Sequence, residues 1–308
     1  MQTELPHPQL YFPVSKNAFS FQTGLKTLAK NDKVIQIDSE YHRYFQNKRT
    51  KKGVCYHQFV QRKKLKPEIE KATCKYLIDT LLKNYPDFFS QTVHLNEIHL
   101  TNNITMETLK FNLNYDFLSS TKHEYQDAMD ALVSQMQEDM SIVTLDDDSD
   151  KICYLHLCAP NFWSAEEKIG KSFSNAHQSV PGMDKINRQH RSLNSLLSNS
   201  GPFERFTWGL TSNINLSQHP NETITDSRNL IDATTIYLRI ERQVTAPFEK
   251  YNAYLFFIRT YFRRLQSLNP DEKGRLANSL NTMPDDIAEY KGISQQVIQI
   301  IDRIRKEV

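Results

Sequence analysis

The sequence predicts an α+β fold in which helices are inserted between the strands of an antiparallel sheet. Runs of alternating apolar side chains, typical of strands, recur from residue 141 to residue 262, and apolar residues at helical spacing lie before, between and after them. The 308 residues include only eight glycines, and there is no low-complexity tract or internal repeat. We therefore expect one continuous domain over residues 1–308.

The N-terminal part, residues 1–123, is expected to be a helical elaboration of this domain. A helix is predicted over Glu68 to Tyr85, because apolar residues recur there on one stripe. Pro67 suits the first helical turn, where no backbone N–H is needed, and Pro86 cannot continue the helix. The same spacing predicts a second helix over Glu124 to Met140.

Five strands and two further helices follow. The predicted strands are Ser141 to Leu145, Ile152 to Cys158, Arg205 to Leu210, Tyr237 to Thr245 and Asn252 to Phe262. The first two form a hairpin, and the helices come directly after it. One helix covers Trp163 to Ile169, with Ser164 and Glu167 as a capping box and Gly170 beyond its end. The other covers about Asp184 to Leu197.

This order, two strands, helices and three strands, is the layout of a PAS-type domain, in which an antiparallel sheet and its helices enclose a ligand pocket. We therefore predict a PAS-like core over residues 124–265. The C-terminal part, residues 266–308, is predicted to be helical. Asn269 to Glu272 is a helix-start signal, Met283 to Lys291 is a helix that ends at Gly292, and a final apolar stripe follows.

Charge and leader patterns disfavour several classes of protein. Lysine and arginine number 38 against 36 acidic residues, so net charge does not indicate binding to nucleic acid or to an anionic membrane. The basic runs Lys48 to Lys52 and Arg62 to Lys64 are interpreted as solvated surface, with docking of an acidic partner as the alternative. No basic leader precedes an apolar stretch, and no run of about eighteen apolar residues occurs, so a cytoplasmic location is expected.

The four cysteines are interpreted as reduced structural thiols. Cys55, Cys74, Cys153 and Cys158 lack the spacing of zinc or iron-sulfur sites. Cys153 and Cys158 lie an odd number of residues apart on one predicted strand, so they face opposite sides and cannot easily chelate together.

Two arginines occupy strand positions where the alternation predicts apolar side chains. Arg242 shares a strand face with apolar residues, and Arg259 lies in a strand that is apolar on both faces. A guanidinium cannot shed its proton, so its burial requires a carboxylate, a phosphate or an acidic ligand. Glu241 and Glu249 could form internal pairs with these arginines. The alternative is a bound anion, which the excess of arginine over nearby acids favours.

Several ordered segments carry a family resemblance. They are Gly24 to Leu28, Ile37 to Tyr41, Gln137 to Asp139, Pro160 to Trp163, Glu167 to Gly170, His177 with Val180 to Gly182, Trp208 to Leu210, Leu238 to Gln243, Phe257 to Tyr261 and Tyr290 to Gly292. With these segments, most of the chain resembles the heme-dependent oxidative N-demethylase family, formerly a family of unknown function. Agreement of so many segments in order is more specific than any single motif.

The resemblance implies that a PAS-like domain binds heme b and that the chain is the catalytic subunit of a dimethylamine-oxidising monooxygenase. In that family, dioxygen is activated at the iron, and a methyl group of the secondary amine leaves as formaldehyde. Electrons from NADPH arrive through partner subunits that carry flavin and an iron-sulfur cluster. This chain has no cluster motif and no dinucleotide-binding glycine fingerprint, which fits a subunit that receives its electrons from such a reductase. Homo- or hetero-oligomerisation is left open.

The resemblance also implies the iron ligand. His177 matches the family's histidine before a Val-Pro pair, and a neutral imidazole suits heme iron, so His177 is the expected axial ligand. The structural interpretation of His177 is a capping or core histidine. His156 and His190 are the competing ligands.

Further site residues are implied in the same way. The catalytic set is Glu241, Arg242, Arg259 and Tyr261, and the cofactor-binding set is His177, Arg239, Arg242, Arg259 and Trp208. The arginines suit heme propionates or bound dioxygen, and the carboxylate suits an ammonium substrate or a proton relay. The alternatives are a structural ion pair for the glutamate and a core position for the tryptophan.

Two departures from the family pattern leave the substrate open. Gln178 and Ser179 stand where a proline usually precedes the Val-Pro pair, and Thr207 replaces a common asparagine. Two other functions compete with the N-demethylase. One is a PAS-like heme sensor, which the lack of an evident output domain disfavours. The other is a heme-free module that binds another acid or a protein partner.

Overall fold

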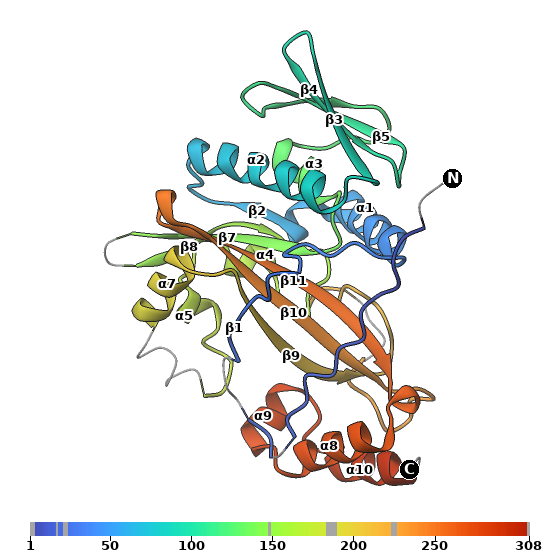
Figure 1. Ribbon diagram of the computed structural model, residues 1–308. Helices are drawn as coiled ribbons and strands as arrows, with labels where there is room; N and C mark the ends of the chain where they lie inside the picture. The colour runs from blue at the N-terminus through green and yellow to red at the C-terminus, as the bar shows by residue number, and fades with distance from the viewer. Residues whose placement is uncertain are drawn as a thin grey trace.

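The computed structural model describes residues 4–16, 18–20, 24–146, 149–182, 190–222 and 227–306. Helices and antiparallel strands are combined in these residues, which confirms the α+β class. A seven-stranded sheet forms the centre of the molecule. A smaller four-stranded sheet projects beyond one end of it, and the C-terminal helices cover the other end (Figure 1).

The central sheet contains all five predicted strands and two short edge strands. In spatial order it consists of β1 (Lys26–Thr27), β9 (Phe203–Thr211), β10 (Tyr237–Phe248), β11 (Ala253–Arg264), β7 (Asp139–Leu145), β8 (Asp150–His156) and β2 (Val60–Arg62). All neighbours are antiparallel. β10 and β11 pair over their full length and are joined by the 3₁₀ turn Glu249–Tyr251, so one long hairpin forms the middle of the sheet.

The two faces of this sheet are covered by different segments. The face that carries Tyr254, Phe256 and Ile258 packs against the short helices α4 (Ala165–Lys168), α5 (Phe173–Ala176) and α7 (His190–Asn199), and we call it the α5 face. The opposite face, which carries Leu255 and Phe257, packs against α1 (Tyr41–Phe59) and α2 (Pro67–Asn84), and we call it the α1 face. Of the helix predicted over residues 184–197, residues 184–189 lie outside the described residues.

The helical prediction for residues 1–123 is corrected by the structure. Besides α1 and α2, this part contains a second antiparallel sheet of β3 (Phe89–His94), β4 (Glu97–Asn102), β5 (Glu107–Asn112) and β6 (Phe117–Ser120). No glycine or proline occurs from residue 89 to residue 120. The turns instead place Leu95, Asn96, Met106 and Tyr115 at positive φ. The two strongest turn markers, glycine and proline, were therefore missing from this stretch.

The predicted helix Glu124 to Met140 is also corrected, because α3 covers only Ala128–Val133. The Asp127 side chain caps its start by accepting from the N–H of Asp130. After its end, Lys48 donates to the carbonyl oxygens of Val133, Met136 and Glu138. The main chain is thus held in an irregular, fully buried segment that leads into β7. Lys48 itself is only 1% exposed, so its interpretation as solvated surface was wrong.

The C-terminal part confirms the helical prediction. After the 3₁₀ turn Leu265–Ser267, the chain forms α8 (Pro270–Asn281), α9 (Asp285–Tyr290) and α10 (Val297–Lys306). The start signal at Asn269 is a complete capping box with Glu272. These helices bury apolar residues against the ends of β10 and β11. Within the described part of the chain, every helix is too short or too polar to span a bilayer.

Candidate functional site

His177 is held by the short helix α5, whose C-terminal end it caps. Its Nδ1 lies 2.8 Å from the carbonyl oxygen of Phe173, and its ring packs on the rings of Phe173 and Trp163 at centroid separations of 4.3 and 4.7 Å. Burial lowers the pKa of His177 to about 4, and the positive charges of Arg205 and Lys168 act in the same direction. The imidazole is therefore neutral at neutral pH. With Nδ1–H donating to the carbonyl, Nε2 carries the lone pair that a metal ion can accept.

A row of polar side chains crosses β9 and β10 on the α5 face. Arg205 Nε donates to Gln243 Oε1 at 2.7 Å, and Gln243 Nε2 donates to Glu241 Oε2 at 3.1 Å. Thr207 Oγ1 donates to the same carboxylate oxygen at 3.3 Å. The register places these residues together, because Arg205 is paired with Gln243 and Thr207 with Glu241. The hydrogen bonds hold the Glu241 carboxylate in one orientation.

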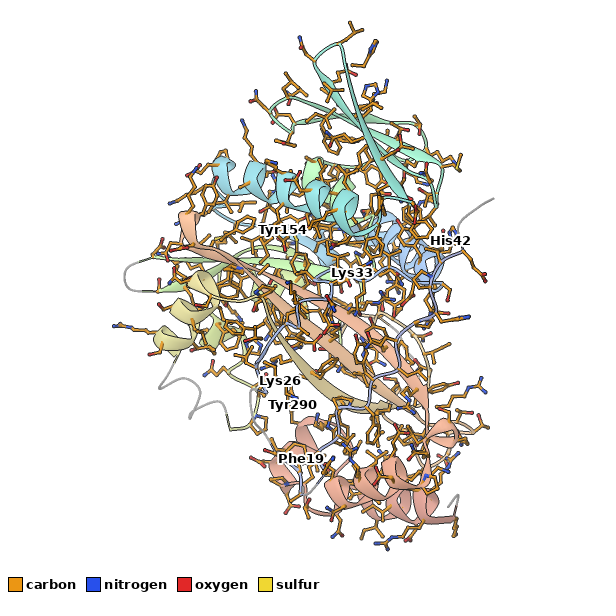
Figure 2. The ribbon with its side chains drawn as sticks, in the orientation of Figure 1. Phe19, Lys26, Lys33, His42, Tyr154 and Tyr290 are labelled. Atoms are coloured by element: carbon orange, nitrogen blue, oxygen red, sulfur yellow. The ribbon has the colours of Figure 1, made fainter. Side chains whose placement is uncertain are left out.

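The C-terminal end of α9 brings a phenol, Tyr290, and the next residue, Lys291, brings an ammonium to this row. Lys291 Nζ donates to the carbonyl oxygen of Trp208 at 2.6 Å. Burial lowers the pKa of Lys291 to about 8, and the negative charge of Glu241 partly offsets that shift. Tyr290 hydrogen-bonds with Trp163, whose ring packs on the imidazole described above, and it lies at the end of the sheet that faces α9 (Figure 2). The α5 face thus holds an imidazole and a carboxylate, and the Lys291 ammonium is close enough to the carboxylate to interact with it electrostatically.

One family model matches residues 24–299, which is most of the chain, and the family is described as "Haem-dependent oxidative N-demethylase, alpha subunit-like". The chain belongs to this family. The resemblance predicted from the sequence is thereby confirmed. The family description gives heme as the cofactor, oxidative N-demethylation as the activity and an alpha subunit as the place of such chains in a larger enzyme.

The surroundings of His177 fit a heme in this N-demethylase family member. A metal-binding imidazole commonly donates its second nitrogen to a carbonyl or a carboxylate, which fixes the tautomer, and Nδ1 of His177 does so. Trp163 and Phe173 supply flat apolar surface beside the imidazole, as a porphyrin requires. Arg205, which acts electrostatically on His177, brings positive charge to the same face.

Arg242 and Arg259, which the sequence predicts to meet an anion, have partners within the chain itself. Both point to the α1 face, opposite Glu241. Arg242 Nε lies 2.5 Å from Glu204 Oε1, and Arg259 Nη2 lies 2.7 Å from Asp38 Oδ2. These acids are not the two glutamates considered from the sequence. They come from β9 and from the segment before α1, so the pairs depend on tertiary structure.

Arg239, Tyr261 and Trp208 also have contacts within the protein. The Arg239 guanidinium donates to four main-chain carbonyl oxygens at 2.9 to 3.3 Å, those of Ala159, Pro160, Asn215 and Leu216. Tyr261 donates to the Gln36 side chain, and Trp208 is paired with Ile240, which places it on the α1 face. Of the predicted site residues, the structure therefore brings Glu241 into the polar row near His177 and places Trp208, Arg242, Arg259 and Tyr261 on the opposite face.

The competing iron ligands differ in position. His156 is fully buried at the end of β8, where it lies beside Asp130 and Cys158. The side chain of His190 lies outside the described residues, although its backbone begins α7. His177 is thus the histidine that the described structure places on the α5 face next to the polar row.

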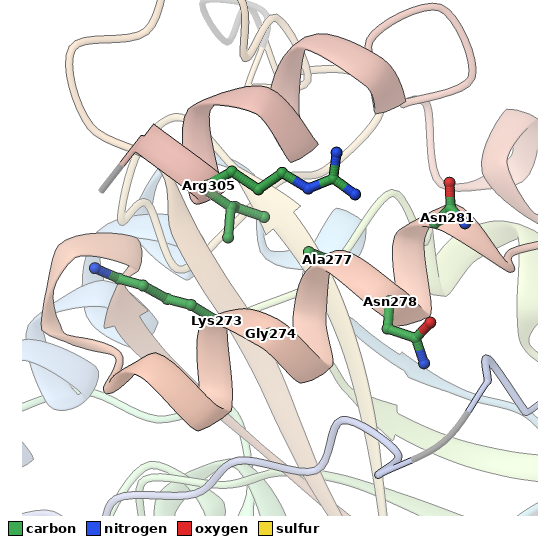
Figure 3. Close-up of a pocket in the computed structure, with 7 residues that line it drawn as sticks. Lys273, Gly274, Ala277, Asn278, Asn281 and Arg305 are labelled. Carbon is green, nitrogen blue, oxygen red and sulfur yellow. The ribbon is translucent and has the colours of Figure 1, made fainter. Parts of the chain in front are cut away.

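Two surface cavities lie elsewhere. One of about 220 Å³ lies between α8 and α10 and is lined by residues such as Lys273, Asn278 and Arg305 (Figure 3). Another of about 250 Å³ lies between the start of α2 and β6, next to Tyr115. Neither is lined by His177 or by the polar row.

Sequence reasoning missed Arg205, Gln243 and Lys291 as site residues. The alternation of side chains along β9 and β10 is sufficient to place Arg205 and Gln243 on the same face as Glu241. The prediction instead relied on Arg242 and Arg259, which lie on the other face. Lys291 lies in a segment that carried the family resemblance. Its contact with Trp208 depends on how the C-terminal helices fold back, which a local pattern does not reveal.

Proposed function

We propose that this chain binds heme b through His177 and is the catalytic subunit of an oxidative N-demethylase that acts on a small secondary amine such as dimethylamine. One observation carries the proposal. His177 is a neutral imidazole with Nδ1 fixed on a carbonyl, next to a partly buried row that contains a carboxylate. The family supports the cofactor and the class of reaction, and Glu241 supports a cationic substrate.

We further propose that the heme pocket is PAS-like. Counted along the chain from β7 to β11, the five core strands have the spatial order 3-4-5-1-2, which supports this layout. The helices α4, α5 and α7 lie between the second and third of these strands in sequence and cover one face. In this proposal the α5 face is the pocket wall.

Bound heme would supply an iron at which dioxygen is activated. The residues of the chain have other tasks. Glu241 binds the substrate ammonium by a charge-assisted hydrogen bond and accepts its proton, while Thr207 and Gln243 keep the carboxylate oriented. Lys291 places a positive charge near Glu241.

Arg205 is our candidate for the cation that meets a heme propionate or bound dioxygen. It lies on the α5 face and carries positive charge toward His177. Arg239, Arg242 and Arg259 were assigned this part from the sequence. Because their guanidinium groups already contact protein acids and carbonyls, we propose that they stabilise the fold around the pocket.

Electrons from NADPH would reach the site through separate reductase subunits that carry flavin and an iron-sulfur cluster. The description of the family as alpha subunit-like supports such partners. The sequence also lacks a dinucleotide-binding fingerprint and a cluster motif.

An absorbance spectrum of the purified chain tests the cofactor and the ligand together. Protein produced with ample heme supply is expected to show a Soret band, and His177→Ala is expected to lose most of its heme. His57→Ala, which changes an exposed histidine of α1, is the matched control and should keep it. A colourless wild type would contradict heme binding. An unchanged ferric spectrum in His177→Ala would contradict the ligand.

Turnover separates an enzyme from a heme sensor. With an electron donor and dimethylamine, the heme-loaded chain is expected to release formaldehyde. A protein that binds heme fully but releases no formaldehyde from any small secondary amine would support the sensor.

A further inference from the structure

A second group of potential metal ligands lies near the junction of β7 and β8. Asp139, His156 and Cys158 place a carboxylate oxygen, a ring nitrogen and a thiol sulfur within 4.8 Å of one another. All three residues are buried, with exposed fractions of 2%, 0% and 0%. We propose that they bind a divalent transition-metal ion, and that zinc is the ion the site takes.

The three donors suit zinc by type, and the imidazole and thiol also suit it by spacing. Zinc binds thiolate sulfur at about 2.3 Å and imidazole nitrogen at about 2.0 Å, so tetrahedral donors around it lie roughly 3.5 Å apart. His156 Nδ1 lies 3.7 Å from Cys158 Sγ. The two residues are two positions apart at the end of an extended strand, which places both side chains on the same side. Three protein ligands leave one position of a tetrahedral ion for a water molecule.

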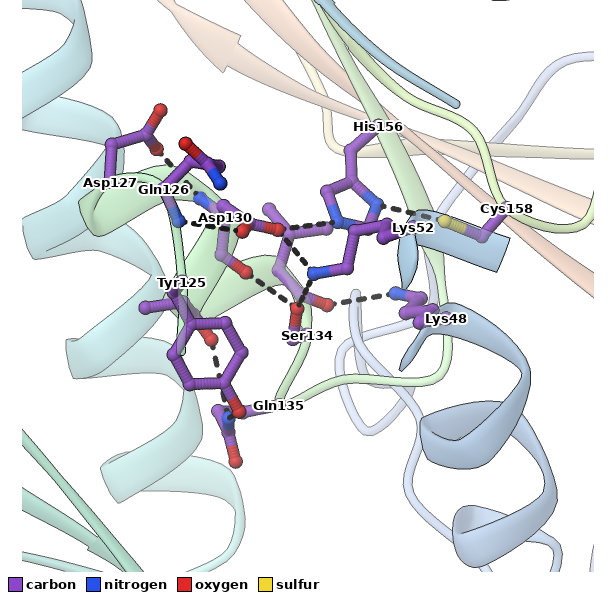
Figure 4. Close-up of polar contacts among 12 residues, drawn as sticks. Lys48, Lys52, Tyr125, Gln126, Asp127, Asp130, Ser134, Gln135, His156 and Cys158 are labelled. Carbon is purple, nitrogen blue, oxygen red and sulfur yellow. Dashed lines mark hydrogen bonds and ion pairs between the residues drawn. The ribbon is translucent and has the colours of Figure 1, made fainter. Parts of the chain in front are cut away.

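The other nitrogen of His156 faces a carboxylate, the kind of group that commonly orients metal-bound histidines, at ion-pair distance and without a direct hydrogen bond. Its Nε2 lies 3.4 Å from Asp130 Oδ1, so His156 stands between Asp130 and Cys158 (Figure 4). A carboxylate in this position keeps the proton on Nε2 and directs the Nδ1 lone pair toward the ion.

Two lysines lie near the proposed ligands and add positive charge to their surroundings. Lys52 forms an ion pair with Asp130, and Lys48 donates to three main-chain carbonyls. Both ammonium groups lie close enough to act electrostatically on Cys158. A metal ion displaces the thiol proton, and the thiolate and the Asp139 carboxylate then balance its two positive charges. The ligand set is therefore neutral with the ion bound.

The Asp139 carboxylate is also pre-oriented. Its oxygens accept from the backbone N–H groups of Cys158 at 2.9 Å and Ala159 at 2.7 Å. These bonds close the loop that follows β8, and they leave each carboxylate oxygen with a lone pair for an ion. Because the site is sealed, the ion would enter while the core forms and would exchange slowly.

This site is independent of the proposed heme. His156 is paired in register with Met140, which is paired with Phe257, so it lies on the α1 face. His177 and the polar row lie on the α5 face. The metal content of the protein therefore tests this proposal whether or not heme is bound.

The experiment measures zinc in the purified full-length chain, produced with zinc supplied, and counts heme iron separately. About one zinc per chain is expected in the wild type, and at least a tenfold loss is expected in Cys158→Ser. Cys153→Ser is the matched control, because Cys153 is also buried but bonds to Thr144 and to the Lys151 carbonyl instead. It should retain the zinc.

A second measurement is independent of the variants. The wild type, refolded with cobalt in place of zinc, is expected to show a near-ultraviolet thiolate-to-cobalt charge-transfer band. Folded wild type that contains no zinc and shows no such band would overturn the proposal. The contact between Cys158 and His156 would then be a hydrogen bond in the protein core. Full zinc retention in folded Cys158→Ser would overturn it as well.

Discussion

Arg242 lies directly opposite Arg259 across β10 and β11, so two buried guanidinium groups are neighbours on the α1 face. Like charges in opposed strand positions repel each other. Each guanidinium group is paired with a different carboxylate. Glu204 on the adjacent strand pairs with Arg242, and Asp38 in the segment before α1 pairs with Arg259. Carbonyl oxygens from residues 33–36 accept further hydrogen bonds from both arginines. The arginines therefore fasten the N-terminal segment to the sheet.

Replacing Asp38 by Asn is expected to destabilise the protein strongly. The change leaves the Arg259 charge buried without its counter-charge, and breaking a buried pair in this way costs about 3 to 5 kcal/mol. Urea unfolding followed by circular dichroism measures the loss.

Glu40→Gln provides the control for this prediction. The Glu40 side chain is 44% exposed and pairs with Arg43, so its loss should cost less than about 1 kcal/mol. If the two variants lost the same small amount, the Asp38 pair would not be holding the segment.

The sequence was informative about the sheet because its strands carry strong local signals. β10 and β11 combine dense apolar alternation with a short connection, and the capping box at Asn269 starts α8 where expected. The sheet β3 to β6 has weaker signals. β3 buries only Phe89, and the turns use residues such as Leu95 at positive φ where glycine is the usual marker. β4 and β5 do alternate apolar and polar residues, but without glycine or proline between them this pattern was not interpreted as a sheet.

The candidate site shows the same division. Glu241 and His177 could be named from a motif, since each lies in a segment that matches the family. The partners of the arginines could not, because Asp38 lies 221 residues from Arg259 in sequence. A buried charge shows that a partner exists, but chain topology decides which residue that partner is.

Lys291 predicts a specific pH dependence of stability. Burial lowers its pKa from 10.5 to about 8 in the folded state, so the unfolded chain binds more protons between those two values. The buried Lys291 charge therefore lowers the free energy of unfolding below about pH 8, and this free energy rises as the pH increases from about 8 toward 10. Below pH 8, Lys291→Met should be more stable than the wild type, or should lose less stability than the broken hydrogen bond alone would cost. The free energy of unfolding of the variant minus that of the wild type should then become smaller, or change sign, as the pH rises.

Urea unfolding of both proteins at a series of pH values measures this difference. Lys250→Met, which changes an exposed lysine beside the β10–β11 turn, is the control and should show no such trend. Parallel stability curves for Lys291→Met and the wild type from pH 7 to pH 10 would contradict a lowered pKa.

Thr207→Val tests whether the hydrogen bond to Glu241 matters for the proposed reaction. The change keeps the shape of the side chain but removes the O–H that donates to the carboxylate. A hydrogen bond to a charged group is worth about 1.5 to 3 kcal/mol, so kcat/KM for dimethylamine should fall by roughly 10- to 100-fold. The heme content of Thr207→Val should be unchanged. Thr245→Val is the control variant, because Thr245 lies on β10 on the same face as Glu241. Equal kinetics in both variants would argue against the role of Thr207.

Glu241→Gln separates substrate binding from heme binding. The amide preserves the size of the side chain and much of its hydrogen bonding, but it removes the negative charge that we propose for the substrate ammonium. Removing one partner of a buried charge pair costs about 2 to 5 kcal/mol, so kcat/KM should fall by roughly 30-fold or more while the Soret band stays as in the wild type. Glu249→Gln changes an exposed carboxylate at the end of the same strand and should leave both quantities unchanged. Loss of heme in Glu241→Gln would place the carboxylate in cofactor binding instead, and unchanged kinetics would remove it from the mechanism. Thr207 and Gln243 both donate hydrogen bonds to Glu241 and so hold its negative charge in place for a cation. The structure therefore favours a lower kcat/KM with an unchanged Soret band.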